Sequence, residues 1–327
     1  MTQLAKKDKV FFPFGQQLSF DRMRQYGLIL ALVVLFIVMS LVADNFFAVS
    51  NLMNIARQLS VTSIASVGMT LVILIGGIDL SVGSILALSG VMAAMMYSSI
   101  ESPFLALFVG VLAGAAVGFF NGFVTAKGQI AGFITTLATM SAIRGLSYIF
   151  TDGMPISETS PSFIYIGTGY FWGIPIPIYI MIIILLLGSY IVKFTRFGRY
   201  IYAIGGNEQT SKWSGLKVDR VKIYVYTISG LLTGLAGVIL ASRLASGQPS
   251  AGDGFELDVI AGVIVGGTSL SGGKGNISGT FIGVLLIGIL GNGLTLLNVS
   301  SYYQMVIKGG IIILAVLLDT LGRRGKD

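Results

Sequence analysis

Long apolar stretches without a charged residue dominate this sequence. Windows such as 28–42 and 178–187 contain no Asp, Glu, Lys or Arg. A helix needs about 20 apolar residues to cross the hydrocarbon of a bilayer, and a spanning helix satisfies all of its own backbone hydrogen bonds. The pattern predicts an all-α polytopic membrane protein with segments at 26–43, 54–75, 80–98, 103–126, 130–150, 176–193, 221–242, 256–270, 277–297 and 302–320, about ten in all. The run 256–270 is short and begins with two acidic residues, so we expect a half-helix there.

Composition and charge support a membrane location. Of the 327 residues, 54% are hydrophobic and only 11% charged, whereas a soluble domain has about a quarter of its residues charged. The net charge of +7 comes from Lys and Arg at the ends of apolar runs, which is the distribution that orients helices. We therefore expect a membrane and no nucleic acid as the partner.

Cys and His are absent from the sequence. Their absence excludes thiol nucleophiles, disulfides and imidazole bases, and nearly every zinc site. The carboxylates inside apolar runs are too few for a catalytic pair, which argues against a membrane-embedded enzyme. We predict neither catalytic nor metal-ligating residues.

The basic residues also predict the topology, since short cytoplasmic loops collect Lys and Arg. Residues 1–25 are basic and polar and precede no cleavage site, so we interpret them as a cytoplasmic tail and not a signal peptide. A single transmembrane domain, 26–320, follows, and 321–327 form a second cytoplasmic tail. Of the two long loops, 194–220 lies inside. The outer loop 151–175 contains three prolines, which favours an ordered lid or docking surface over a helix.

One glycine-rich stretch occurs twice. Gly76, Gly77, Leu80 and Ser81 match Gly266, Gly267, Leu270 and Ser271, with apolar runs on both sides each time. The match predicts two related halves, and ten full crossings would put both stretches on the cytoplasmic side; one re-entrant segment would change that. The glycines that we expect to act in packing and as hinges are Gly76, Gly77, Gly83, Gly266, Gly267, Gly272 and Gly273.

Asp79, in the first glycine stretch, is the sharpest candidate for a functional side chain, and the second copy has Ser269 in its place. A carboxylate at bilayer depth costs several kcal/mol unless it is paired, hydrogen-bonded or wetted. If the glycines break a helix near the midplane, Asp79 lines a polar cavity. If the helix ends there, Asp79 caps the next helix at the inner surface, and the local spacing favours this second arrangement.

A polyhydroxylated solute needs hydrogen-bonding side chains along its route, and several lie in the apolar runs. We predict a translocation path or gate at Asp79, Ser81, Asn121, Thr135 and Asn292, with further polar groups at Thr136, Thr139 and Arg144. The alternative for each Ser or Thr is a bond to its own helix backbone. Glycines at every fourth position from 110 to 122 predict a close helix contact, more in keeping with packing inside one subunit than with a dimer face.

The inner loop contains signals for a short helix. Asn207 is a good N-cap, Glu208 suits the first turn and Gly215 is a natural stop. An ordinary amphipathic connector explains the spacing equally well. The nearby stretch 267–274 fails as a phosphate loop, because Gly275 and not Ser or Thr follows Lys274. The chain therefore shows no nucleotide site of its own.

Several sequence words, in this order, resemble the membrane subunits of bacterial carbohydrate ATP-binding-cassette (ABC) importers, the family of ribose, arabinose, xylose and galactose permeases. The words are Gly-Ile-Asp-Leu-Ser-Val-Gly at 77–83, Phe-Ile-Thr-Thr-Leu-Ala-Thr-Met at 133–140, Arg-Phe-Gly-Arg at 196–199, Ile-Gly-Gly-Asn-Glu at 204–208, Gly-Gly-Thr-Ser-Leu-Ser-Gly-Gly-Lys-Gly at 266–275 and Ser-Ser-Tyr-Tyr-Gln-Met-Val-Ile-Lys at 300–308. The wording is closest to ribose-type members.

The resemblance implies a permease subunit in the bacterial inner membrane that imports a monosaccharide, first of all a pentose. Its partners would be a second permease subunit (a copy or a paralogue), a cytoplasmic ATPase that binds the ATP and Mg, and a periplasmic or lipid-anchored sugar-binding protein. The family's coupling helix would fall on Asn207, Glu208, Gln209, Thr210, Lys212, Trp213 and Gly215. The loop departs from the Glu-Ala-Ala-x3-Gly pattern of other importers by one extra residue.

The alternative function is an ion-gradient-driven secondary transporter of a small polar solute. Asp79 and the internal repeat are compatible with it. However, one acidic residue without any His is too little for a chain of proton-transferring groups. The short helix in the inner loop would also have no function in such a transporter.

Overall fold

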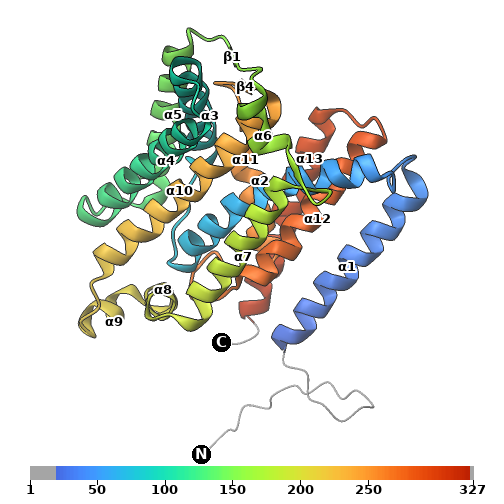
Figure 1. Cartoon of the computed structure of the whole chain (residues 1–327). Helices are drawn as coiled ribbons and strands as arrows, with labels where there is room; N and C mark the ends of the chain where they lie inside the picture. The colour runs from blue at the N-terminus through green and yellow to red at the C-terminus, as the bar shows by residue number, and fades with distance from the viewer. Residues whose placement is uncertain (1–19, 325–327) are drawn as a thin grey trace, which may run out of the picture.

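The structure, a computed structural model, is a helical bundle. It describes residues 20–324, with side chains for 27–317. Figure 1 shows the arrangement. The helices are α1 (Phe20–Val42), α2 (Val49–Leu74), α3 (Val82–Ile100), α4 (Pro103–Lys127), α5 (Gly132–Thr151), α6 (Pro161–Thr168), α7 (Ile176–Phe194), α8 (Arg196–Gly206), α9 (Glu208–Trp213), α10 (Val218–Leu244), α11 (Phe255–Val265), α12 (Ile277–Leu296) and α13 (Ser301–Arg324).

Every apolar run expected from the sequence contains a helix. Seven of the described helices are long and apolar enough to cross a membrane, namely α2, α3, α4, α5, α7, α10 and α12. The apolar parts of α1 and α13, Gly27–Val42 and Ser301–Leu317, are shorter. The run 256–270 forms the 11-residue helix α11, so the expected half-helix is confirmed.

The described helices extend into both expected tails, 1–25 and 321–327. Helix α1 already begins at Phe20, and α13 continues to Arg324. The remainder of the two expected tails, 1–19 and 325–327, lies outside the described residues.

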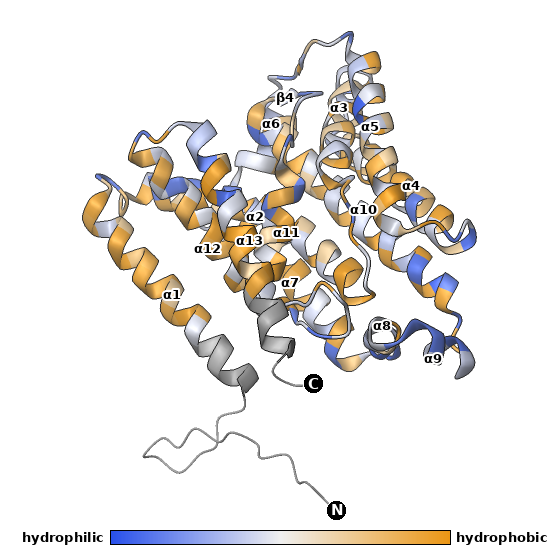
Figure 2. Ribbon diagram, turned by 180° about the vertical axis from the view of Figure 1, so that it is seen from behind, coloured by the Kyte–Doolittle hydropathy of each residue, from blue (hydrophilic) through white to orange (hydrophobic). Residues whose placement is uncertain are grey.

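Helix α2 forms the centre of the bundle. In its most apolar window 83% of the residues are buried, compared with 22% in α5 and α7 and 28% in α4. Most residues in the apolar windows of α4, α5 and α7 are therefore not buried, and in Figure 2 the ribbons of peripheral helices such as α1 and α4 are mostly orange, the colour of hydrophobic residues. Such a surface is stable only in contact with lipid or with another apolar surface.

The glycine face of α4 packs against α10 within the chain, as predicted. A side chain at Gly114 would collide with the carbonyl of Gly230, and one at Gly118 with the carbonyl of Tyr226. Small residues at such crossings let two backbones approach closely. Since one chain supplies both sides, these glycines are not available for contact with a second copy.

The outer loop 151–175 is ordered but does contain a helix, so the expectation of a non-helical lid was wrong. Pro161 occupies the first turn of the eight-residue helix α6, where proline is well tolerated. Strand β1 (Ile156–Ser157) pairs with β4 (Ser246–Gly247), and β2 (Tyr170–Phe171) forms a hairpin with β3 (Ile174–Pro175). Figure 1 shows α6, β1 and β4 at one end of the bundle and α8, α9, the start of α1 and the end of α13 at the other.

Candidate functional site

The turn between α2 and α3 begins with a glycine helix end. Gly76 has a φ of 79° and donates its N–H to the carbonyl of Ile73, while Gly77 donates to that of Val72. This pattern is the Schellman motif, in which glycine accepts the left-handed conformation without strain. Helix α2 therefore ends abruptly, and residues 75–81 pass into the bundle.

Asp79 lies completely inside the protein. Its side chain is 0% exposed. One carboxylate oxygen accepts from the backbone N–H of Ser81 at 3.0 Å and from its hydroxyl at 2.6 Å, and the other accepts from Ser229 of α10 at 3.4 Å. Among the described residues no Lys or Arg forms an ion pair with Asp79. Neutral donors alone satisfy this carboxylate.

The two arrangements considered for Asp79 are each only partly correct. Ser81, and not Asp79, occupies the N-cap position of α3, and it makes no side-chain cap bond. Asp79 nevertheless accepts from the backbone just beyond it, as a cap would. It lines no open cavity, since burial closes it on all sides.

Two other helices hold the same turn. Asn121 of α4 donates to the Ser81 hydroxyl at 2.8 Å. Thr136 of α5 accepts from the N–H of Leu80 at 3.1 Å and lies 3.2 Å from the carbonyl of Ile78. We call Asp79, Ser81, Asn121, Thr136 and Ser229 the buried turn network. The sequence identified Asp79, Ser81 and Asn121 as candidates, while Ser229 gave no signal of its own.

Thr135 and Asn292 do not join this network. Thr135 is buried on α5, and its hydroxyl has no partner among the described residues. Asn292 of α12 exchanges two hydrogen bonds with Asn51 of α2, at 3.0 and 3.1 Å. Asn51 lies in the first turn of α2, whereas Asp79 follows its last turn. The structure thus separates Asn292 from the other predicted path residues.

The second glycine turn has the same helix end, displaced by one residue from the sequence match. Gly267, with a φ of 96°, donates to the carbonyl of Ile264, and Thr268 donates to that of Val263. Gly76 is therefore equivalent to Gly267 and not to Gly266. Gly266 still needs to be small, because a side chain there would collide with the backbone of Gly279.

The second turn packs against the end of the first and against α8. Gly273 donates its N–H to the carbonyl of Leu74 at 2.9 Å. Gly272, with a φ of 81°, lies beside Gly76 and Gly205. A side chain at Gly205 would collide with both Leu74 and Gly273. The two turns and α8 thus meet at one point.

The predicted inner-loop helix is present as α9, with Asn207 as its N-cap as expected. Asn207 caps α9 by accepting from the N–H of Thr210 at 2.8 Å, and Gly215 follows the helix with a φ of 82°. The sequence did not predict α8, an 11-residue helix capped by Thr195. Of the predicted coupling residues, the exposed ones are Asn207, Gln209, Thr210, Lys212, Trp213 and Gly215.

Glu208 faces the protein more than its surroundings. It forms ion pairs with Lys222 of α10 at 2.7 Å and with Lys212 at 2.8 Å. Partial burial by itself would raise the pKa of Glu208, but hydrogen bonds and charge from Lys212 and Lys222 outweigh it and hold the pKa below its usual value. Glu208 therefore anchors α9 to α10, and Trp213, 78% exposed, is the large free side chain of this surface.

Two ion pairs that join α5 and α13 to the residues around the start of α11 were not predicted. Arg144 of α5 pairs with Asp253 at 3.0 Å, and Lys308 of α13 pairs with Asp258 at 2.8 Å. The sequence signal was a charge within an apolar run. The sequence analysis noted Arg144 as a polar group within an apolar run and Asp258 as a residue at the start of the run 256–270, but it did not predict their partners.

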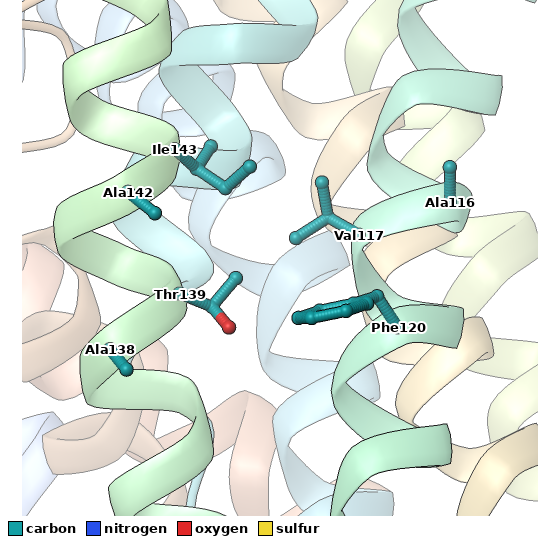
Figure 3. A pocket seen from close by; sticks show the side chains of 7 residues that line it. All are labelled: Ala116, Val117, Phe120, Ala138, Thr139, Ala142 and Ile143. Carbon is teal, nitrogen blue, oxygen red and sulfur yellow. The ribbon is translucent and has the colours of Figure 1, made fainter.

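An apolar groove lies between α4 and α5. Its volume is about 390 Å³, and its walls are Ala116, Val117, Phe120, Ala138, Thr139, Ala142 and Ile143. Figure 3 shows one oxygen among these side chains, that of Thr139, and it donates to the carbonyl of Thr135. The groove thus offers almost nothing to a hydroxylated ligand. Within residues 20–324, no group of His, Cys, Asp and Glu could hold a metal ion.

Comparisons with known proteins agree on a transport role. A family model described as "Branched-chain amino acid transport system / permease component" matches residues 51–316. The ribose import permease protein RbsC of Haemophilus influenzae is 52% identical over 89% of this chain and 91% of its own length. RbsC of Bacillus subtilis is 50% identical (93% and 95%), and the L-arabinose transport system permease protein AraH of Escherichia coli is 39% identical (94% of each).

The fold has a solved counterpart. A metal-chelate type ABC transporter in an inward-facing conformation superposes with a TM-score of 0.53 over 91% of this chain and 99% of its own, at 15% identity. At that identity the likeness concerns the fold alone.

Proposed function

Because this chain belongs to the family of transport-system permease components, we propose that it is the membrane subunit of an ATP-driven ribose importer. The observation that carries the proposal is the identity of 52% with a ribose import permease over nearly the whole of both chains. A permease component is a transport subunit and not an enzyme. The secondary-transporter alternative finds no support among the relatives.

In this proposal the chain crosses the bacterial inner membrane ten times. The seven long helices, α1 and α13 account for nine crossings. The tenth combines the non-helical residues after β4 with the short helix α11. Both termini and α8 and α9 then share the cytoplasmic side, in agreement with the basic residues Lys193, Arg196 and Arg199 between α7 and α9.

The proposed partners follow from two surfaces. The exposed side of α9, with Trp213 projecting from it, docks on a cytoplasmic ATPase that binds ATP and Mg. The ordered outer loop receives a sugar-binding protein. A second permease subunit covers part of the apolar outside, so the sugar passes between two subunits that alternate between conformations as the ATPase works.

Reconstitution tests the function. Proteoliposomes containing this chain, its ATPase, the binding protein and internal ATP should take up radiolabelled ribose, and leaving out any one component should abolish uptake. Uptake by the chain alone under an ion gradient would contradict the proposal.

A pair of tryptophan variants tests the docking surface. Trp213→Ala should lower retention of the ATPase on the permease at least about tenfold, because exposed aromatic side chains dominate many interfaces. Trp172→Ala is the matched control, since Trp172 is equally prominent on the outer hairpin and should leave retention unchanged. If the Trp213→Ala permease retained the ATPase as well as the wild type does, α9 would not be the docking helix.

A further inference from the structure

The two ion pairs around the start of α11 lie at the level of the hydrocarbon. Arg144 is about 18 Å along α5 from the Gly132 end of this 20-residue helix. Lys308 is about 10 Å from the start of the 24-residue helix α13. In the proposed topology α5 and α13 span a hydrocarbon core about 30 Å thick, which places the four charges at its depth.

Arg144 fastens a stretch of irregular backbone at this depth. Its guanidinium donates to the carbonyls of Pro249 at 2.7 Å and Ala251 at 2.6 Å, in addition to its ion pair with Asp253. The stretch lies against the first turn of α3, where a side chain at Gly83 would collide with the carbonyl of Gly252. Non-helical backbone persists at membrane depth only when protein covers it or water reaches it.

The carboxylate of Asp253 is open rather than covered. Its side chain is 71% exposed, whereas that of Arg144 is 17% exposed. In contact with lipid tails this carboxylate would cost several kcal/mol. A water-filled passage removes that cost. We therefore place water, and not lipid, against the side of the bundle that carries Asp253.

The remaining polar groups lie on the same side. Helix α13 packs against α11, and the Arg144–Asp253 ion pair joins α5 to the residues just before α11. Asp253 precedes α11 and Asp258 lies in its first turn. Gln304 lies one turn before Lys308 on α13 and donates to the carbonyl of Val299. By contrast, the exposed residues of α4 and α7 at this depth are apolar, such as Phe120 and Leu186.

We propose that Arg144, Asp253, Asp258, Gln304 and Lys308 form a polar station at which the hydroxyl groups of the monosaccharide bind during passage, with the Asp253 carboxylate as the principal acceptor. This inference rests on the proposed function, and the second permease subunit closes the station from the other side. A carboxylate accepts from two neighbouring hydroxyls at once. The ion pairs already occupy much of the capacity of these groups, so the sugar is held weakly, as a transit site requires.

The station is separate from the buried turn network. Asp79 is fully covered and all its acceptor contacts come from Ser81 and Ser229. It offers no accessible atom to a sugar in this conformation. The predicted path residue Asp79 is thus a positioning residue for the turn. In this inference Asp253, and not Asp79, is the carboxylate on the translocation path.

A thiol-accessibility experiment tests whether the station is wet. The chain has no Cys, so Asp253→Cys introduces its only thiol. In the assembled importer a charged, membrane-impermeant thiol reagent should label this variant at least tenfold faster than Leu186→Cys, the matched control on the apolar side of α7. Ribose delivered by the binding protein should slow the labelling. Equal labelling of the two variants, or labelling indifferent to ribose, would overturn the station.

Transport by conservative variants tests its role. Asp253→Asn should lower the maximal rate of ribose uptake at least fivefold. The control is Asp219→Asn, which removes the charge from a comparable ion pair with Lys127 at 2.9 Å at the inner helix ends. Wild-type uptake by Asp253→Asn contradicts the inference. Absence of ribose uptake by the wild-type complex would instead contradict the proposed function, while the labelling result would still report on the station.

Discussion

The two glycine turns end their helices in the same way and then serve different purposes. In both, a left-handed glycine and the following N–H close a Schellman motif, at Gly76 after α2 and at Gly267 after α11. The first turn then enters the bundle, where side chains from α4, α5 and α10 hold it. The second lies beside α8, and glycine backbones bring it into contact with α2 and α8.

The difference separates two kinds of attachment. A turn held by buried side chains is fixed by polar groups that must all stay satisfied. A turn held through glycine backbones is fixed by close packing and tolerates no added atom. Substitutions should therefore affect the two turns by different mechanisms and to different extents.

The largest effect is expected where the second turn meets α8. Gly205→Val should lower the free energy of unfolding by about 4 kcal/mol, because the side chain collides with the Leu74 and Gly273 backbones and breaks their hydrogen bond. Gly206→Val is the control, since nothing lies within 4 Å of a Cβ there. Thermal unfolding in detergent compares the variants, and equal midpoints would refute tight backbone packing.

The next effect concerns the first turn. Asp79→Ala should lower the free energy of unfolding by about 2 to 3 kcal/mol, because the donors of Ser81 and Ser229 lose their buried acceptor. Asp79→Asn retains an acceptor oxygen and should cost less than half as much. Denaturation of both variants checks the order, and an equal loss in both would show that charge, and not hydrogen-bond acceptance, holds the turn.

A smaller effect depends on pH and concerns the attachment of α9 to α10. The pKa of Glu208 is lowered from its usual 4.5 in the folded protein. The stabilisation is therefore fully present above about pH 4.5 and is lost as the pH falls through the folded pKa. Because Glu208 is partly solvated, this stabilisation amounts to less than about 1 kcal/mol. The free energy of unfolding of Glu208→Gln should equal that of the wild type in acid and be lower near neutral pH. A constant difference between the two proteins across that pH range would contradict the role of the ion pairs.

The smallest effect tests the weakest contact of the buried turn network. Ser229→Ala should cost only about 0.5 kcal/mol, since its bond to Asp79 is long, at 3.4 Å. A calorimetric midpoint close to that of the wild type is expected. A loss as large as that of Asp79→Ala would make Ser229 the main support of the carboxylate.

Local signals predicted local structure well. The Asn207 cap and the Gly215 stop bounded α9, and the short acidic-led run became α11. Helix α8 escaped prediction because its burial depends on Ile201 and Ile204 meeting other helices. The repeat was aligned one residue off, since sequence words match letters whereas the left-handed φ determines which glycine ends each helix.

The sites depended on contacts between distant segments. The sequence identified Asp79, Ser81 and Asn121, but not that Ser229 would complete their surroundings. It grouped Asn292 with them, although Asn292 pairs with Asn51 in the first turn of α2, at the end of the helix opposite to Asp79. Arg144 and Asp253 are 3.0 Å apart only because the residues after β4 turn back into the bundle, and a helical periodicity cannot predict that return.

The hydrogen bond between Leu74 and Gly273 couples α2 to the second glycine turn. The C-terminal end of α2 is thus attached to the turn that contacts α8, and its 26 residues extend about 39 Å to the opposite end of the bundle. Close packing along that length leaves little room for local bending. A small tilt of α2 that begins at α8 would therefore displace the N-terminal end of α2 the most. The hydrogen bonds between Asn51 and Asn292 lie at that end and would be the first to change.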